Sequence, residues 1–194
     1  MSAATRTPLA VIRPTADRLI DALRPFCRRI ELAGSLRREK STIGDIEIVA
    51  IPILPTNLFG EELLDQPTPL DRFLDSCNIT FAKRGARYQQ FTYGRHTIDL
   101  FLATADTWGS VYTIRTGSWE FSRWLVTSRA AGGAKPDEVQ FRDGRLLTNG
   151  RLLNTPEEAD VFAALGLVRI EPYLRHGPVA NPARIDPVWD YEEE

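Results

Sequence analysis

The sequence predicts an α+β fold in which strands dominate the first half of the chain and helices the second. The β-branched run 43–53 is typical of a strand, and the segments on either side of Gly94-Arg95 alternate as the two strands of a hairpin do. Beyond the hairpin, apolar residues recur at helical spacing. We therefore expect two parts: residues 1–104, with most of the strands, and residues 105–194, smaller and rich in helix, with a β-hairpin and an acidic tail.

The elements of the first part follow from apolar spacing and turn residues. A helix is expected to begin with Thr15 as its N-cap, and a strand at 30–32 follows it. Ala33-Gly34-Ser35 interrupts that strand. Residues 55–67 begin and end with proline and indicate a surface connection, after which Thr68-Pro69 opens a short helix.

The second part is predicted in the same way. Two helical stretches, 108–114 and 118–131, end at Gly132-Gly133. Residues 139–153 contain two turn signals and indicate a hairpin. The sequence Thr155-Pro156-Glu157-Glu158 is a capping box that opens a last helix.

Composition excludes several classes of protein. The 194 residues are 43% hydrophobic and 26% charged with a formal net charge of −2, which argues against a disordered chain, a collagen or a disulfide scaffold. The longest apolar run, 48–54, is far short of the ~20 residues that a membrane helix needs. We expect a protein of the cell interior, in cytoplasm or nucleoid, without membrane contact. Cys27 and Cys77, each placed on the apolar side of a helix, are expected to be reduced core residues.

The basic residues are unevenly distributed. The segments 1–50 and 81–130 are net positive, and all but three of the 24 basic side chains are arginines, which suit bidentate contacts with phosphate. A small net charge argues against tight non-specific binding of nucleic acid but is compatible with a basic cleft. Chance fluctuation is the alternative explanation of this pattern.

Three carboxylates can share one face of the predicted sheet. Residues two apart on a strand point the same way, so Asp45 and Glu47 share a face, and Asp99 joins them if its strand is a neighbour. Three carboxylates at one site repel one another unless cations neutralise their charge. A set of ligands that are all oxygen suits Mg²⁺. The alternative is that these are solvent-facing acids on exposed strands.

A glycine–serine turn precedes the first two carboxylates. In Gly34-Ser35-Leu36-Arg37-Arg38, the break after a strand exposes backbone N–H groups and a hydroxyl, and the arginines that follow can reach triphosphate oxygens. Taken alone, Gly-Ser is more often only a turn.

Taken together, these motifs resemble a known superfamily. Gly34-Ser35, then Gly44-Asp45-x-Glu47, then Asp99 on a later strand resemble the nucleotidyltransferases. The segment Arg115-Thr116-Gly117-Ser118 before a helix and the segment 155–175 are similar to the family X DNA polymerases. The resemblance spans about residues 15–175 and is greatest to the minimal viral members. It implies a palm, a mixed sheet with helices on one face, without a lyase or helix–hairpin–helix domain.

The resemblance implies a role for each matching residue. Asp45, Glu47 and Asp99 would be the metal ligands and catalytic residues. The proposed phosphate contacts are Gly34, Ser35, Arg38 and Gly44. Gly117 and Ser118 would begin the helix that lines the nascent base pair, with Trp119 and Ser122 on the nucleotide and Arg123 on the template. Arg84 and Arg87 match a basic stretch near the primer strand. Trp119 is expected to stack on a base, with packing within the fold as the alternative. Trp124 is expected to pack within the fold, with base stacking as the alternative.

The activity that the resemblance implies is that of a DNA-directed DNA polymerase. Such an enzyme adds dNMP from dNTP to a primer 3′-hydroxyl with two Mg²⁺ (Mn²⁺ can substitute) and releases pyrophosphate. The expected substrate is primer-template or gapped DNA, with short-gap filling in DNA repair as its use, and a monomer is expected. Two alternatives stay open: a nucleotidyltransferase with another acceptor, and a template-independent terminal transferase. A viral origin also stays open.

Overall fold

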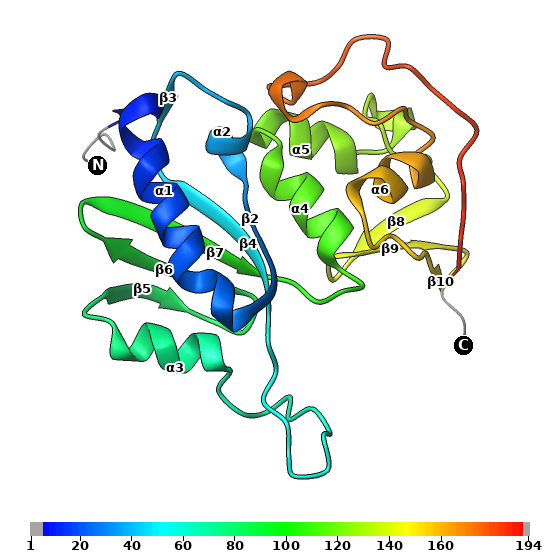
Figure 1. Cartoon of the computed structure of the whole chain (residues 1–194). Coiled ribbons are helices and arrows are strands. Elements are labelled where there is room, and N and C mark those ends of the chain that lie inside the picture. The colour runs from blue at the N-terminus through cyan, green and yellow to red at the C-terminus, as the bar shows by residue number, and fades with distance from the viewer. Residues whose placement is uncertain (1–5, 192–194) are drawn as a thin grey trace. The chain divides into compact units, whose positions relative to one another are not determined.

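The computed structural model describes residues 6–191, so the last three residues of the acidic tail lie outside it. The chain has a mixed α+β fold with six α-helices among the described residues, which confirms the predicted fold class (Figure 1). It divides into two compact units. The first is formed by Met1–Leu32 and Ser41–Thr104, and the second by Ala33–Lys40 and Ala105–Glu194. The segment 33–40 thus belongs with the second unit. The predicted division into 1–104 and 105–194 does not include this exchange.

The first unit is built on a five-stranded mixed sheet. Its strand order is β2-β4-β7-β6-β5, in which β4 and β7 run parallel and the other neighbours antiparallel. The strands are β2 (Cys27–Leu32), β4 (Ile46–Pro52), β5 (Thr80–Arg84), β6 (Tyr88–Tyr93) and β7 (His96–Leu102). A separate pair, β1 (Thr7–Pro8) and β3 (Thr42–Ile43), is antiparallel. The predicted hairpin around Gly94-Arg95 is confirmed.

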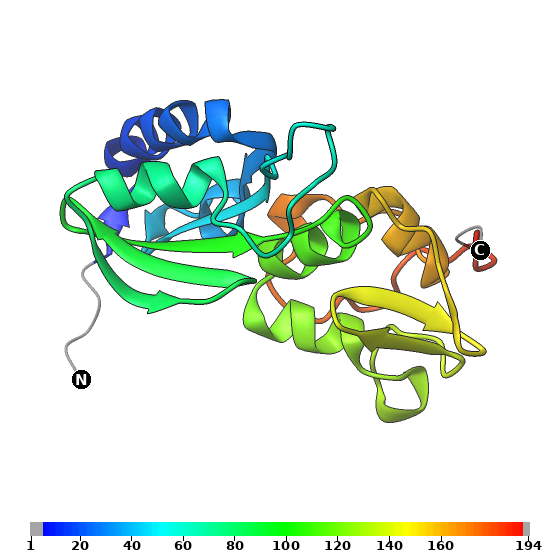
Figure 2. The same ribbon diagram turned by 90° about the horizontal axis from the view of Figure 1, so that it is seen from below.

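Two helices cover one face of this sheet. They are α1 (Leu9–Leu23), which a 3₁₀ turn at Arg24–Phe26 extends, and α3 (Pro69–Ser76), and both lie on the same side in Figure 2. The face beneath them is apolar. Ile46 and Ile48 of β4 lie opposite Ile98 and Leu100 of β7, and all four are fully buried. Burial of this kind contributes about 2 kcal/mol per side chain, which makes this layer the core of the unit.

Three local predictions for the first unit were wrong. The first helix begins at Leu9, after Pro8 as N-cap, and not at Thr15. Pro14 lies inside it and cannot donate the hydrogen bond to the carbonyl four residues earlier. Ile12 on the same helix is fully buried, and this burial offsets the lost hydrogen bond. Helix propensity alone does not include such tertiary burial. Cys27 begins a strand and Cys77 is the C-cap of α3, so neither lies within a helix; both are free thiols.

The strand β5 was not expected at all. Its five residues, Thr80–Arg84, are mostly exposed, because they form the edge of the sheet. An edge strand with little burial lacks the apolar alternation on which sequence prediction depends. By contrast, α3 carries the expected N-terminus: Thr68 and Asp71 form a reciprocal capping box, with Pro69 at the first helical position.

The second unit packs helices around a small sheet. Its helices are α2 (Gly34–Arg37), α4 (Trp108–Thr116), α5 (Trp119–Val126) and α6 (Glu158–Ala164), with 3₁₀ turns at Arg129–Ala131 and Pro172–Leu174. The sheet is antiparallel, with order β10-β9-β8, from β8 (Val139–Arg142), β9 (Arg145–Thr148) and β10 (Arg151–Leu152). Buried apolar residues of α5, α6 and the sheet form one core cluster that includes Phe121, Trp124 and Phe162.

Two details of the second unit differ from expectation. The predicted helix 118–131 ends at Val126, and a 3₁₀ turn that ends at the left-handed Gly132 replaces its last part. The last helix is capped by Glu157 with Asp160, and not by Thr155. Carboxylates at a helix N-terminus satisfy free N–H groups as a hydroxyl does, so the capping box is shifted by two residues and not lost.

None of the helices in residues 6–191 is both long enough and apolar enough to span a membrane.

Candidate functional site

The three predicted carboxylates lie on, or directly before, two adjacent strands of the first unit. Glu47 of β4 and Asp99 of β7 are directly opposite each other in the parallel register, and Asp45 lies two residues before Glu47. Ile46, Ile48, Ile98 and Leu100 alternate with them toward the buried face. Glu47 and Asp99 therefore occupy the face opposite the helices, where both are half-buried, as strand alternation predicts.

Asp99 is held in place by the neighbouring strand β6. The Tyr88 hydroxyl donates to Asp99 Oδ1 at 2.5 Å, and Gln90 Nε2 donates to the same oxygen at 2.8 Å. The Tyr88 ring is in turn stacked on Phe101, two residues beyond Asp99 on β7, with 5.0 Å between ring centroids. Both hydrogen bonds fall on Oδ1, and among the described residues none is shown to the second carboxylate oxygen.

The chemistry of this donor set fits Mg²⁺. All three groups are carboxylates, and oxygen ligands suit this ion. Glu47 and Asp99 are paired across the two strands, and Asp45 precedes Glu47 by two residues. As the side chains stand, no three Asp, Glu, His or Cys residues in the part of the chain that the structure describes are gathered closely enough to hold an ion. The fit of these residues to Mg²⁺ therefore rests on residue type and backbone register alone.

The predicted basic contacts of the first unit lie on and after the edge strand β5. Arg84, at the end of β5, forms an ion pair with Asp75 of α3, and this hydrogen bond lowers the pKa of the Asp75 carboxyl. Arg87 is exposed in the turn between β5 and β6. Gly44 directly precedes Asp45, and a side chain at this position would meet nothing within 4 Å. An exposed ion pair of this kind contributes little stability, so Arg84 can exchange Asp75 for another anion.

The glycine–serine turn forms the short helix α2 in the second unit. Gly34 has a φ of +56°, a conformation that L side chains rarely adopt, so the turn requires glycine here. Arg38, at the C-terminal end of α2, is only 8% exposed and donates from Nη1 to the Thr116 carbonyl. The Ser35 hydroxyl oxygen is buried and has no hydrogen-bond partner among the described residues. Leaving a buried hydroxyl without a hydrogen-bond partner lowers the stability of the fold. A functional role is one explanation for such a group in a native protein.

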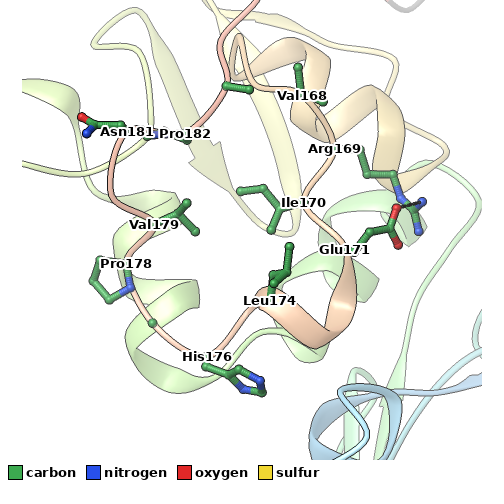
Figure 3. Close-up of a pocket in the computed structure, with 12 residues that line it drawn as sticks. Val168, Arg169, Ile170, Glu171, Leu174, His176, Pro178, Val179, Asn181 and Pro182 are labelled. Atoms are coloured by element: carbon green, nitrogen blue, oxygen red, sulfur yellow. Dashed lines mark hydrogen bonds and ion pairs between the residues drawn. The ribbon is translucent and has the colours of Figure 1, made fainter.

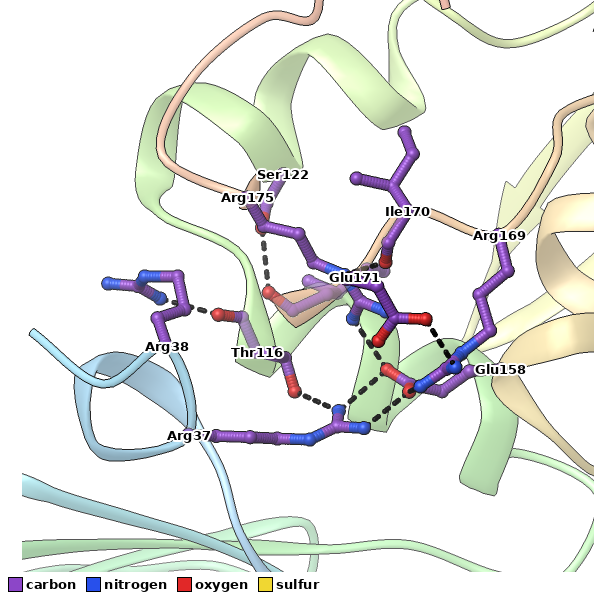
Figure 4. Close-up of polar contacts among 10 residues, drawn as sticks. Arg37, Arg38, Thr116, Ser122, Glu158, Arg169, Ile170, Glu171 and Arg175 are labelled. Carbon is purple, nitrogen blue, oxygen red and sulfur yellow. Dashed lines mark hydrogen bonds and ion pairs between the residues drawn. The ribbon is translucent and has the colours of Figure 1, made fainter. Parts of the chain in front are cut away.

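Arg37, one of the two arginines expected to reach triphosphate oxygens, instead enters a buried charge cluster (Figure 4). Its guanidinium forms two hydrogen bonds with Glu158 of α6, at 2.7 Å to Oε1 and 2.6 Å to Oε2. A third, of 2.6 Å, goes to the Thr116 hydroxyl. Arg175, fully buried, donates to Glu158 Oε1 at 2.6 Å and to the Ile170 carbonyl at 2.8 Å. One carboxylate thus accepts from two arginines, so Arg37 is not placed to meet a phosphate.

The cluster controls the charge state of Glu158. Burial raises the pKa of the Glu158 carboxyl, but hydrogen bonds from Arg37 and Arg175 lower it more, so the net pKa lies below its ordinary value. Burial also lowers the pKa of Arg175, which Glu158 opposes. Glu158 is therefore an anion throughout the neutral range.

This shift predicts a pH dependence of stability. A carboxyl whose pKa is lower in the folded state stabilises the protein above its unfolded pKa, and that contribution is lost as the pH falls through the folded value. We expect Glu158→Gln to lower the free energy of unfolding at pH 7, and the gap to the parent protein to narrow below the ordinary pKa of 4.5. Urea unfolding of both proteins at pH 7 and at about pH 3 measures the gap. A gap that is equal at both pH values would contradict this account.

The Thr-Gly-Ser segment joins α4 to α5. Gly117 is the C-cap of α4, and Ser118 is the N-cap of α5, where its Oγ accepts from the Phe121 N–H and donates to the His176 carbonyl at 2.7 Å. The Ser122 hydroxyl donates to the Ile114 carbonyl at 2.6 Å. Both serine hydroxyls are thus used in building the junction between the helices.

The two tryptophans of α5 have opposite environments. Trp124 is 8% exposed and packs against Phe121 in the core, as predicted. Trp119 is 70% exposed, and the guanidinium of Arg123, one turn later, lies 5.2 Å from the centre of its ring. This leaves a large aromatic surface in solvent beside a cation, which is the pair of features that binds nucleobases and phosphates.

A cavity of about 470 Å³ lies elsewhere in the second unit (Figure 3). It is lined by 168–171, 174, 176–179 and 181–183, which include Ile170, Leu174 and Val179 on its apolar side and the ion pair of Arg169 with Glu171. The segment 155–175 contributes 168–171 and 174 to its lining, but none of the individual residues to which the resemblance gives a role lines it. The cavity is separate from the residues of the α2 turn and of α5.

Sequence reasoning missed the residues that hold the predicted ones in place. Tyr88 and Gln90 could have been found, because a two-residue turn at Gly94-Arg95 places Gln90 opposite Asp99. Glu158 and Arg175 carried no such signal. Their partner Arg37 is 121 residues from Glu158 in the chain, and no local pattern connects them.

No protein-family model matches this chain, and neither does any curated protein.

Proposed function

We propose that this protein is a metal-dependent nucleotidyltransferase that adds deoxynucleoside monophosphate to a DNA 3′-hydroxyl and releases pyrophosphate, as the family X DNA polymerases do. The observation that carries the proposal is the register of the parallel strands β4 and β7, which sets Glu47 opposite Asp99 with Asp45 two residues away. In this proposal the first unit is a palm.

The chain's own residues have distinct tasks in this reaction. Two Mg²⁺ bound by the three carboxylates would neutralise charge at the attacking and leaving oxygens. Asp99, fixed by Tyr88 and Gln90, would accept the proton of the primer hydroxyl or orient that hydroxyl. Such catalysis consists mainly of positioning and of electrostatic stabilisation.

The second unit supplies the nucleotide contacts in this proposal. The Ser35 hydroxyl, buried without a partner among the described residues, is a donor for a phosphate oxygen. Arg38 would bring positive charge to the same group, and the exposed ring of Trp119 would stack on the base. Arg84, Arg87 and Arg123 are proposed to contact DNA phosphates. The proposed partners are dNTP and primer-template or gapped DNA, bound by a monomer inside the cell.

Primer extension tests the proposal. A labelled DNA primer is incubated with Mg²⁺ and each dNTP in turn, once at a single-nucleotide gap and once as a blunt single strand. Incorporation of only the template-matched nucleotide at the gap is the expected result. If no nucleotide is added to either substrate by folded protein with Mg²⁺ or Mn²⁺, the proposal fails and an acceptor other than DNA becomes the next hypothesis.

The exposure of Trp119 favours a second candidate, a template-independent terminal transferase. A base stacked on this ring gains about 1–3 kcal/mol without any template partner. We expect Trp119→Ala to reduce addition to the single strand about tenfold or more if this candidate is correct. Tyr173, 57% exposed in the same unit, provides the matched control, since Tyr173→Ala removes an exposed ring of similar size. Equal loss in both variants would argue against stacking at Trp119.

A further inference from the structure

We infer that Glu158 is a positioning residue for triphosphate binding, which it controls through Arg37 and the α2 turn. The inference rests on the proposed function, since it assigns a role toward the same nucleotide. The residues involved all belong to the second unit.

Thr116 is bound by both arginines of the α2 turn. The hydroxyl of Thr116 accepts from Arg37 Nη1 at 2.6 Å, and its carbonyl accepts from Arg38 Nη1. Thr116 directly precedes Gly117 and the N-cap of α5. These contacts therefore fix the turn that carries Ser35 relative to the start of the helix that carries Trp119, and so join two segments proposed to bind opposite ends of one nucleotide.

Glu158 determines whether Arg37 can make this contact. The two hydrogen bonds from the Arg37 guanidinium to the Glu158 carboxylate set its plane, and the ring of Tyr112 lies 3.7 Å from the guanidinium carbon and supports its position. The side chains of Arg37 and Glu158 are 17% and 7% exposed, so water competes little for these bonds. A bidentate pair of this kind is directional, which favours a single orientation of Arg37.

Arg175 has a different task, although it binds the same carboxylate. It reaches Glu158 Oε1 and the Ile170 carbonyl, and no hydrogen bond joins it to the α2 turn among the described residues. Its contribution is therefore to hold Glu158 ionised in a buried place. Of the two arginines, only Arg37 connects Glu158 to the segments proposed to bind the nucleotide. A positioning effect through Arg37 can therefore be distinguished from a general loss of stability.

The test uses steady-state primer extension by the full chain, with Arg37→Met, Glu158→Gln and the double variant. Methionine keeps the length of the side chain against Tyr112, and in Arg37→Met the carboxylate keeps its bond to Arg175. Each single variant is expected to raise KM for dNTP about tenfold, with kcat and KM for DNA changed less than about threefold. The double variant is expected to match the singles, because both act through one contact. Arg169→Met is the control: Arg169 approaches Glu158 Oε2 only to 3.9 Å and does not reach Thr116.

The outcomes separate the two proposals. Normal KM for dNTP in both single variants, with an active parent protein, overturns the positioning role and leaves the proposed function standing. A fall in kcat and in melting temperature without a change in KM would show a purely structural role and also overturn it. A parent protein that neither extends primers nor binds dNTP in calorimetry removes both. If Glu158→Gln does not fold, Arg37→Met alone decides the question.

Discussion

Asp99→Asn is expected to reduce primer extension by about 10³-fold or more while leaving the protein folded. The variant removes one of three negative charges from the proposed metal site, and metal-assisted stabilisation of a transition state contributes several kcal/mol, each 1.36 kcal/mol being tenfold in rate. The amide oxygen of asparagine can still accept from Tyr88 and Gln90, so the local packing is retained. Rates of single-nucleotide addition at a gap are the measurement.

Two controls make this result specific. Asp17→Asn changes an exposed aspartate of α1 that forms an ion pair with Arg13 one turn earlier on the same helix, and its rate should equal that of the parent. The melting temperature of Asp99→Asn should stay within about 4 °C of the parent, which corresponds to about 1–2 kcal/mol in a domain of this size. Extension at more than a tenth of the parental rate would remove Asp99 from the set of metal ligands.

Gly109→Ala is expected to lower the free energy of unfolding of the second unit by about 3 kcal/mol. Gly109 lies in α4, where its α-carbon faces the chain that leads into α6. An added β-carbon would stand 2.3 Å from the Thr155 carbonyl oxygen and 2.5 Å from that of Glu157. Alanine stabilises a helix interior by about 1 kcal/mol relative to glycine, but two backbone carbonyls cannot move away without displacing the N-terminus of α6. The steric cost therefore exceeds the gain in propensity.

Urea unfolding of Gly109→Ala measures this loss. Gly177→Ala is the matched control, because a β-carbon at Gly177 meets nothing within 4 Å. It should leave stability unchanged within about 0.5 kcal/mol, as surface substitutions usually do. Since α6 begins with Glu158, the same variant should also raise KM for dNTP. A Gly109→Ala protein as stable as its control would mean that α4 and α6 lie farther apart than described.

Local patterns predicted the strands that carry Glu47 and Asp99, and the faces of those strands, well. Alternation placed Glu47 and Asp99 on the side opposite Ile46, Ile48, Ile98 and Leu100, and the structure agrees. The hairpin register follows from its turn, because a short loop leaves only one way to pair the strands. These features depend on residues within about ten positions of one another, and such information is present in the sequence.

Non-local relations were beyond the reach of the same patterns. The parallel pairing of β4 with β7 joins segments about fifty residues apart. The sequence could not predict this pairing, on which the approach of Asp99 to Asp45 and Glu47 depends. The segment 33–40 belongs with the second unit because its two arginines bond to residues far along the chain. Both donate to Thr116, and Arg37 also donates to Glu158. A basic pair after a glycine–serine turn suggested two phosphate contacts, whereas tertiary packing binds one of them, the half-buried Arg37, to Glu158.

The two outer strands of the large sheet have a further consequence, for self-association. Both β2 and β5 leave one row of backbone groups unpaired within the sheet, which is a template for adding another chain. Each contains a register shift, between Cys27 and Arg29 in β2 and between Phe81 and Lys83 in β5, and each carries two basic residues next to it. Bulges twist an edge out of plane and like charges repel a second copy. The sheet is thus built to resist edge-to-edge aggregation at both of its outer strands.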